Sequence, residues 1–526
     1  MRVVRRWSRE RFPSWGSPSE TSFSPVSPLS EQGHVEVHHA ICPWQAALAL
    51  FKCIVGPGVL FLPAGVKNAG LLAAISVSVV CGIAATWCML LMLDTTRYLR
   101  RQGKVVTCVG DVAEIACGRF GRFAVDAAIV ISQLGFCTAY CVFVAENLQA
   151  IIFEVSGGMP HPAGVVSDGS QQLCKLPGIF ADKRLVYYII AAVMPTIAPF
   201  TWIRQIRYFA CTNAVATTLV VLTLIYMLCS FTSQLAERNF TAAPSVKMFE
   251  LRGTLVYFGT AMYAFEGIGF LLPLERSMAD PDKLNLVVCW TMSGACLLQV
   301  IFAGSAYLLY GAGTASIVTI SLGSGGMLGG MAAVELVQLA WVVEVLLTLP
   351  LQLFPAVQIL EPLFFPRGTF RRRHSGQKWR KNIVRCGLLL LCMLVATCGY
   401  SSVDNLIALI GALGCVPLAV VFPPLFHCVL VARCNGPGDA EMGPPVPRGL
   451  TGLLEHPVPH LPMATLPGNV RSTTDTEASG PKEIGGATSD VILSGCGLMG
   501  VILATVVAIL SWIQGDFRLQ ECVLVT

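Results

Sequence analysis

Long apolar runs separated by short polar or basic segments extend along most of the chain. A helix needs about 20 apolar residues to cross a hydrocarbon core of ~30 Å. Runs of about this length occur at eleven places, approximately 44–66, 71–93, 125–151, 185–201, 211–231, 251–274, 286–310, 331–360, 383–400, 406–429 and 491–512. The pattern therefore predicts an all-α polytopic membrane protein with about 11 transmembrane helices.

The first and sixth runs are each interrupted near the middle. Residues 52–63 read KCIVGPGVLFLP, so Gly56, Pro57 and Gly58 fall inside the first run, and residues 259–269 read GTAMYAFEGIG. Glycine raises the backbone entropy cost of a helix, and proline removes a donor and clashes with the preceding turn. Unwound backbone at membrane depth is tolerated only where protein or a cavity surrounds it. Both interruptions therefore predict a binding site.

The positions of the two interruptions favour one architecture. Broken helices one and six, five spans apart, are typical of a LeuT-type 5+5 inverted repeat, in which substrate lies between half-helix ends near the bilayer midplane. A glycine-rich membrane helix can alternatively be a face for close packing, but two matching interruptions favour binding. Free N–H groups beside residues 56–58 suit a carboxylate, and Glu266 with nearby carbonyls suits an ammonium group. A zwitterion, that is a free amino acid, would satisfy both.

The candidate substrate-binding residues come from the two interruptions and from the third run. Tyr140 and Phe265 could stack against a substrate, although an aromatic residue in an apolar span more often serves packing. The full set is Val55, Gly56, Pro57, Gly58, Tyr140, Tyr263, Phe265, Glu266 and Gly267.

Ionisable side chains inside the apolar runs are costly, so each is a functional candidate. Glu266 is the best candidate for contact with an ammonium group or for carrying a proton. Lys52 lies one turn before the first interruption and could take part in ion coupling or act as a structural counter-ion. Glu335 and Glu344 are nine residues apart and should point to opposite sides of a helix. We retain Glu344 as a candidate for ion coupling.

Composition and charge fix the class and predict the orientation. The chain is 54% hydrophobic and 13% charged with a mean hydropathy of +0.66, which excludes a soluble domain. With a cytoplasmic amino terminus, 27 of the 36 Lys and Arg residues lie in inside segments, the positive-inside pattern. The basic residues thus indicate orientation in a lipid bilayer, and no nucleic-acid partner is expected. The sequon at Asn239 falls on the external side and is a glycosylation candidate.

The remaining segments give the expected domain organisation. We expect a disordered cytoplasmic tail over 1–43, a transmembrane core of ten spans over 44–432, a disordered cytoplasmic loop over 433–489, and an eleventh span with a short external terminus over 490–526. The loop is interpreted as a tether, with a regulatory role for its Ser and Thr residues as the alternative. Many of the 21 cysteines lie in apolar runs without metal spacing. We expect no metal site, no cofactor and no enzymatic activity.

Three blocks resemble the amino acid/auxin permease family, most closely its proton-coupled and vacuolar amino-acid transporter branch. They are KCIVGPGVLFLPAGVKNAG at 52–70, QLGFCTAYCVFVAENL at 133–148 and FGTAMYAFEGIGFLLPLE at 258–275. The resemblance implies secondary active transport of small neutral amino acids, usually with a proton. It also implies that Gln352 is a candidate ion ligand. The proton-coupled branch typically has a histidine where this chain has Ala49, so coupling through that histidine is excluded.

These observations favour an amino-acid transporter that works by alternating access, with H⁺ as the candidate coupling ion. The alternative is a membrane sensor that binds an amino acid with little flux, but the low-complexity tails favour transport. A channel is disfavoured because no filter motif is visible. The membrane is expected to be the plasma membrane or a vacuolar or lysosomal membrane.

Overall fold

The structure is a computed structural model that describes residues 41–155, 183–203, 210–322, 330–365 and 375–434, together with isolated positions between 494 and 505. Residues 1–40, nearly all of the expected loop 433–489 and most of the expected span 491–512 lie outside the described residues, so these parts of the domain organisation stay predictions.

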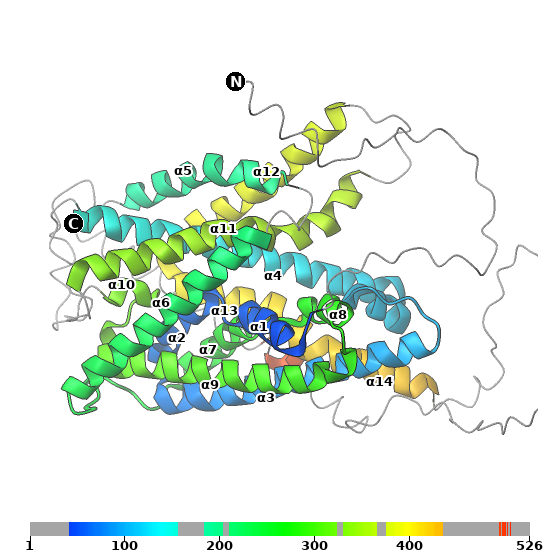
Figure 1. Cartoon of the computed structure of the whole chain (residues 1–526), viewed down its shortest axis with the longest axis horizontal. Coiled ribbons are helices and arrows are strands. Elements are labelled where there is room, and N and C mark those ends of the chain that lie inside the picture. The colour runs from blue at the N-terminus through cyan, green and yellow to red at the C-terminus, as the bar shows by residue number, and fades with distance from the viewer. Residues whose placement is uncertain are drawn as a thin grey trace, which may run out of the picture. The chain divides into compact units, whose positions relative to one another are not determined.

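The described chain is helical almost throughout. Its only β-type pairing in the described residues is one isolated bridge between Ile41 and Met278. The helices that matter below are α1 (Pro43–Ile54), η1 (Pro57–Phe61), α2 (Leu62–Ala69), α3 (Leu71–Arg101), α4 (Val109–Val155), α5 (Lys183–Thr201), α6 (Ala210–Glu237), α7 (Leu251–Ala264), α8 (Ile268–Ser277), α9 (Leu284–Tyr310), α11 (Gly330–Phe364), α12 (Ser375–Gly399), α13 (Val403–Ile410), η8 (Gly411–Cys415), η9 (Pro417–Val421) and α14 (Phe422–Cys434) (Figure 1).

Helices of membrane length make up most of this chain. In the described part, eight helical stretches are long and apolar enough to cross a bilayer, and α1 with η1 and α2 forms a ninth that is bent by 40°. The helix α5 is a shorter apolar helix at the position of the fourth expected run. The protein is therefore an all-α polytopic membrane protein.

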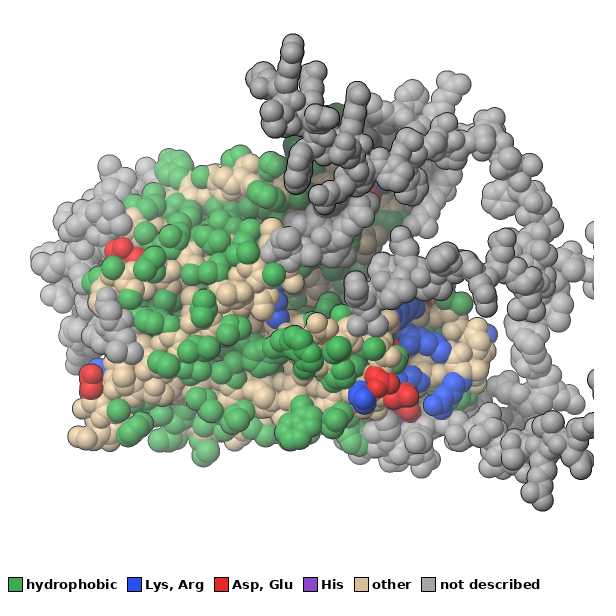
Figure 2. Space-filling view, in the orientation of Figure 1, with side chains coloured by type: hydrophobic (Ala, Val, Ile, Leu, Met, Phe, Trp, Pro, Cys, Tyr) green, Lys and Arg blue, Asp and Glu red, His purple; other side chains and the backbone are tan. Residues whose placement is uncertain are grey.

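The second interrupted helix lies at the centre of the bundle. In the most apolar part of residues 251–277, which hold α7 and α8, 78% of the residues are buried, against 44% for α3 and 33% for residues 379–399 of α12. Figure 1 shows α3 beside α9 along one side, and α5 beside α12 on the other. Side chains such as Leu72 and Trp290 project outward from this bundle, and Figure 2 shows a largely apolar face. Such a surface suits lipid.

Two pairs of half-helices are joined at their outer ends. Gly253 of α7 approaches Asn68 of α2 so closely that a Cβ added to it would lie 1.7 Å from the Asn68 carbonyl oxygen. On the other side of the interruptions, the Ile41 N–H before α1 donates to the Ser277 carbonyl at the end of α8 at 2.8 Å. Each half of the first broken helix is thus tied to one half of the second.

Ion pairs gather at one end of the bundle. Arg97 and Arg100, at the end of α3, contact the buried Glu275 of α8 at 3.0 and 2.6 Å. Arg122 of α4 contacts Asp111 at 2.8 Å. Figure 2 shows the blue side chains concentrated toward one end of the visible face. This is the end that the charge pattern assigns to the cytoplasm.

Two helices differ from the expectation. The third run was expected to begin near residue 125, but α4 begins at Val109 and bends at Gly118, where φ is 68°. The helix begins before the apolar run because its first part carries ion-paired polar residues such as Asp111 and Arg122. The tenth run contains the π-helical segments η8 and η9 between α13 and α14, a widening that hydropathy does not reveal.

Candidate functional site

The first interruption lies where the glycines and proline predict it. The helix α1 ends at Ile54, Val55 leaves the helical region (φ −94°, ψ 66°), and Gly56 is extended. Pro57 then opens η1, and its missing N–H costs nothing at a helix start. Two short helices with freed ends therefore replace one continuous span.

The second interruption is capped by side chains. The helix α7 ends at Ala264, whose carbonyl accepts a hydrogen bond from Gln299 Nε2 of α9 at 3.3 Å. The Glu266 carboxylate accepts a hydrogen bond from the backbone N–H of Gly269, in the first turn of α8. Glu266, 9% exposed, thus has one role already in this conformation, because it satisfies an orphan donor at a helix N-terminus.

The structure brings the two interruptions into contact although they are far apart in the sequence. A Cβ added to Gly58 would lie 3.1 Å from Cε1 of Tyr263 and 3.6 Å from the Cα of Ala264. A Cβ added to Gly267 would lie 3.4 Å from Ile54. The predicted residues of both segments therefore form one cluster, and it is packed shut because Val55, Tyr263 and Phe265 are all buried.

Aromatic rings form one wall of this cluster. Tyr263 packs edge-on against Phe136 of α4 at 4.6 Å between ring centroids and against Phe61 of η1 at 6.4 Å. Phe143 of α4 links Phe61 to Trp341 of α11, at 6.2 and 6.5 Å. The wall therefore contains residues from the first, third, sixth and eighth spans.

Two polar atoms in this wall lack a partner. Tyr263 Oη and Trp341 Nε1 are buried, and neither has a hydrogen-bond partner in the described structure. An unsatisfied buried donor costs about 1–3 kcal/mol, so native proteins rarely keep one without a reason. A bound ligand or water would remove this cost.

Tyr140 belongs to the same wall. It is 6% exposed and lies one turn from Phe136 on α4, close enough to Tyr263 and Glu344 for electrostatic interaction. Sequence reasoning missed Phe136 and Phe143, although their spacing of four and three residues from Tyr140 places all three on one helix face. It also missed Phe61 and Trp341, for which the sequence offers no signal beyond apolar surroundings.

A second group of charged and polar residues lies beside the first interruption. Lys52 Nζ donates to the backbone carbonyl of Asn213 in α6 at 3.1 Å and to the side-chain oxygen of the same residue. Glu344 is 1% exposed and interacts electrostatically with Lys52. One Glu344 oxygen accepts a hydrogen bond from Thr348 at 2.9 Å, and the other has no hydrogen-bond partner in the described structure. Asn213 was not predicted.

The other candidates lie apart from these groups. Glu335 is half-buried whereas Glu344 is fully buried, as their spacing on opposite sides of α11 predicts. Gln352 is also half-buried on α11, and the structure shows no hydrogen bond from it to Lys52, Glu266 or Glu344. Asn239 is exposed at the end of α6, so its glycosylation stays a prediction.

Comparison with known proteins decides the family. The sequence model described as "Transmembrane amino acid transporter protein" matches residues 39–434. The chain belongs to this family. Its relatives include "Vacuolar amino acid transporter 3" of Schizosaccharomyces pombe, 29% identical over 73% of this chain, and "Vacuolar amino acid transporter 3" of Saccharomyces cerevisiae, 31% identical over 76%.

A plant relative, "Amino acid transporter AVT3A" of Arabidopsis thaliana, is 30% identical over 72% of this chain and 79% of its own length. The chain spans about half the length of the two fungal relatives, 52% and 53%. All three are named as transporters and none as an enzyme, in agreement with the expectation of a non-enzyme. The resemblance of the three sequence blocks to this family and its vacuolar branch is confirmed.

Proposed function

We propose that this protein is a secondary active transporter that carries small neutral amino acids across a vacuolar or lysosomal membrane by alternating access. The observation that carries the proposal is the contact between the two interruptions, Gly56–Gly58 and Tyr263–Gly267, at the buried centre of the bundle. The named activities of the family relatives support the amino-acid substrate. The proposed architecture is the LeuT-type inverted repeat, with the amino terminus in the cytoplasm.

The proposed site binds the two ends of a zwitterion with different groups. N–H groups at the start of η1 would hold the carboxylate, because the positive end of a helix dipole favours an anion. The carboxylate of Glu266 and carbonyls at the second interruption would hold the ammonium group. Tyr263 Oη, which is unpartnered, would gain a hydrogen bond on substrate binding. Tyr140 and Phe265 would line the same space.

The aromatic wall favours a small side chain. A Cβ added to Gly58 would lie only 3.1 Å from the Tyr263 ring, and Phe136 packs against that ring at 4.6 Å between ring centroids. A large substrate would have to displace several packed rings, whereas a small one requires only a limited opening. This geometry supports the small size of the proposed substrate.

For coupling, we propose that a proton is carried by Glu344 or Glu266. Ala49 replaces the histidine of the proton-coupled branch, so another ionisable group is needed. Glu344 is buried, has one oxygen without a hydrogen bond, and faces the ammonium of Lys52 electrostatically. Protonation of Glu344 would then remove its electrostatic attraction to Lys52, while Asn213 holds the ammonium group in place by hydrogen bonds. Gln352 remains a weaker candidate ion ligand.

The test is uptake of a panel of labelled neutral, acidic and basic L-amino acids into proteoliposomes, with and without a proton gradient. We expect saturable uptake of small neutral amino acids that the gradient accelerates. Binding without saturable uptake of any amino acid would instead support the sensor.

A further inference from the structure

A buried amide lies beside the second interruption. Gln299 of α9 is 1% exposed, and it is the only residue with a side-chain amide in the apolar run 286–310. An amide at membrane depth is costly unless both of its polar atoms are hydrogen-bonded. Only the nitrogen of Gln299 meets this condition.

The nitrogen of this amide holds the end of α7. Gln299 Nε2 donates to the carbonyl of Ala264, the last residue of α7, at 3.3 Å. The last carbonyls of a helix have no partner within it, so this bond satisfies one that the interruption frees. Because a carbonyl oxygen can only accept, the bond also fixes which end of the amide faces Ala264.

The oxygen of this amide is left over. Gln299 Oε1 is buried and has no hydrogen-bond partner among the described residues. It belongs to the amide that contacts Ala264, and the carboxylate of Glu266 follows two residues along the chain. The amide oxygen, the freed carbonyl and the carboxylate are all hydrogen-bond acceptors. Lys52 is engaged with Asn213 and Glu344 instead.

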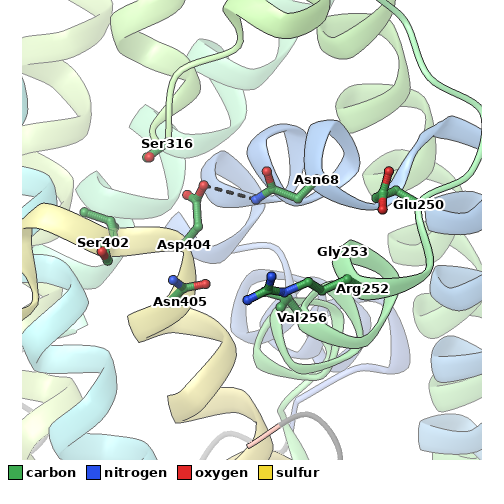
Figure 3. A pocket seen from close by; sticks show the side chains of 10 residues that line it. Asn68, Glu250, Arg252, Gly253, Val256, Ser316, Ser402, Asp404 and Asn405 are labelled. Carbon is green, nitrogen blue, oxygen red and sulfur yellow. Dashed lines mark hydrogen bonds between the residues drawn. The ribbon is translucent and has the colours of Figure 1, made fainter. Parts of the chain in front are cut away.

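A cavity of about 410 Å³ between α2, α7 and α13 differs in this respect (Figure 3). Arg252 shares this cavity with Glu250 and has an interaction partner within the protein. Asp404 Oδ2 accepts a hydrogen bond from Asn68 Nδ2 at 3.2 Å. In the part of the chain that the structure describes, no side chain lining this cavity contributes a buried polar atom without a hydrogen bond. The need for a ligand is therefore greater at Gln299.

We propose that Gln299 binds the ammonium group of the substrate, with Oε1 as an acceptor beside the Ala264 carbonyl and the Glu266 carboxylate. This inference rests on the proposed amino-acid transport and adds a residue of the seventh span to its site. An ammonium group has three N–H donors, which match these acceptors. Each methyl group on the substrate nitrogen removes one donor and leaves an acceptor unfilled. Gln299 therefore selects primary amines over N-methylated ones.

The test compares uptake of labelled L-alanine and N-methyl-L-alanine into proteoliposomes by the wild type and by Gln299→Met, which keeps the side-chain length but removes the amide. In the wild type, the KM for alanine should be at least about tenfold lower, because N-methylation removes a hydrogen bond that involves a charged group. In Gln299→Met, the KM for alanine should rise about tenfold for the same reason. The KM for N-methyl-L-alanine should not change, since its methyl group can face the methionine.

Two further variants separate binding from packing. Gln338 of α11 is equally buried, donates from Nε2 to the Thr319 carbonyl at 3.2 Å, and has an Oε1 without a partner in the described structure. That carbonyl belongs to α10 and not to a broken helix, so Gln338→Met should lose similar stability but keep the preference for alanine. Gln299→Glu should also keep it, because a protonated carboxyl offers one donor and one acceptor in the same place.

Four outcomes overturn the inference and leave the transport proposal intact. They are equal KM values for the two substrates in the wild type, an unchanged preference in Gln299→Met, a preference lost in Gln338→Met or Gln299→Glu as well, and a sodium dependence of uptake that only Gln299→Met removes. If the wild type takes up no alanine, equilibrium binding of both compounds to the wild type in lipid nanodiscs decides. Binding that favours alanine would refute transport and support the role of Gln299, whereas no binding would overturn both.

Discussion

Replacing Gly58 tests whether the interruptions form the central site. A Cβ at this position would lie 3.1 Å from Cε1 of Tyr263, closer than an ordinary contact of about 3.4–4 Å, and 3.4 Å from Cδ1. The Tyr263 ring cannot simply retreat, because Phe136 packs against it at 4.6 Å. Alanine therefore requires a shift of a few tenths of an ångström, whereas leucine adds three more carbons in the same direction.

Overpacking of this kind costs about 1–3 kcal/mol, which corresponds to roughly 5- to 150-fold in an equilibrium constant. The added side chain also occupies the space in which the substrate would bind. We expect Gly58→Ala to lower the affinity for the transported amino acid about tenfold and Gly58→Leu to abolish saturable uptake. Both variants should still insert into the membrane, since the rest of the bundle is unchanged.

The assay is initial-rate uptake of a labelled small neutral amino acid into proteoliposomes, with the protein amount measured for each variant. Gly294→Leu is the matched control, because a Cβ at that position in α9 meets nothing within 4 Å. It should transport like the wild type. Normal uptake by Gly58→Leu, in protein that elutes as a single species, would refute the claim that the first interruption forms the substrate site.

Three further predictions concern coupling, packing and the cytoplasmic end. Glu344→Gln should remove the stimulation of uptake by a proton gradient, while exchange of internal for external amino acid continues. The control Glu335→Gln, on the opposite side of α11, should leave the stimulation intact. Unchanged stimulation in Glu344→Gln would exclude this carboxyl group as the proton carrier. Gly253→Val should prevent stable folding, because its Cβ would lie 1.7 Å from a carbonyl oxygen of α2 that cannot move alone; a wild-type melting temperature in detergent would contradict the close packing. Glu275→Gln should lower the free energy of unfolding by about 2 kcal/mol, because a carboxylate that is only 2% exposed loses its charge-assisted bonds to two arginines. A thermal unfolding curve that coincides with that of the wild type would show that these ion pairs contribute nothing to stability.

The sequence predicts the fold class and the positions of the interruptions because both depend on local chemistry. Apolar run length determines which segments can span a bilayer, and Gly56 and Pro57 disrupt a helix wherever they occur in one. The start of α4 was not predicted because its amino-terminal part carries ionised residues, which keep the apolar run from beginning before residue 125. The π-helical segments of the tenth run were missed because the widening depends on tertiary packing against α7.

The central cluster was predictable only in part. Tyr263 and Glu266 could be named because they lie inside an interruption. Trp341 and Asn213 could not, since their roles arise from how α11 and α6 pack against the broken helices, and a single sequence contains no record of that packing. The pairing of Lys52 with Asn213 shows the same limit, because the sequence indicates an expensive buried charge but not its partner.

The pairing of the half-helices has a mechanical consequence. The contact of Gly253 with Asn68 ties α2 to α7, and the bond from Ile41 to Ser277 ties α1 to α8. In the proposed alternating access, the two interruptions would act as adjacent hinges between two arms, each arm made of one half from each broken helix. Neither broken helix can bend by itself without losing the packing contact between α2 and α7 or the hydrogen bond between Ile41 and Ser277. Any movement that opens the central cluster must therefore swing both spans together, so a crosslink that locks one hinge should immobilise the other.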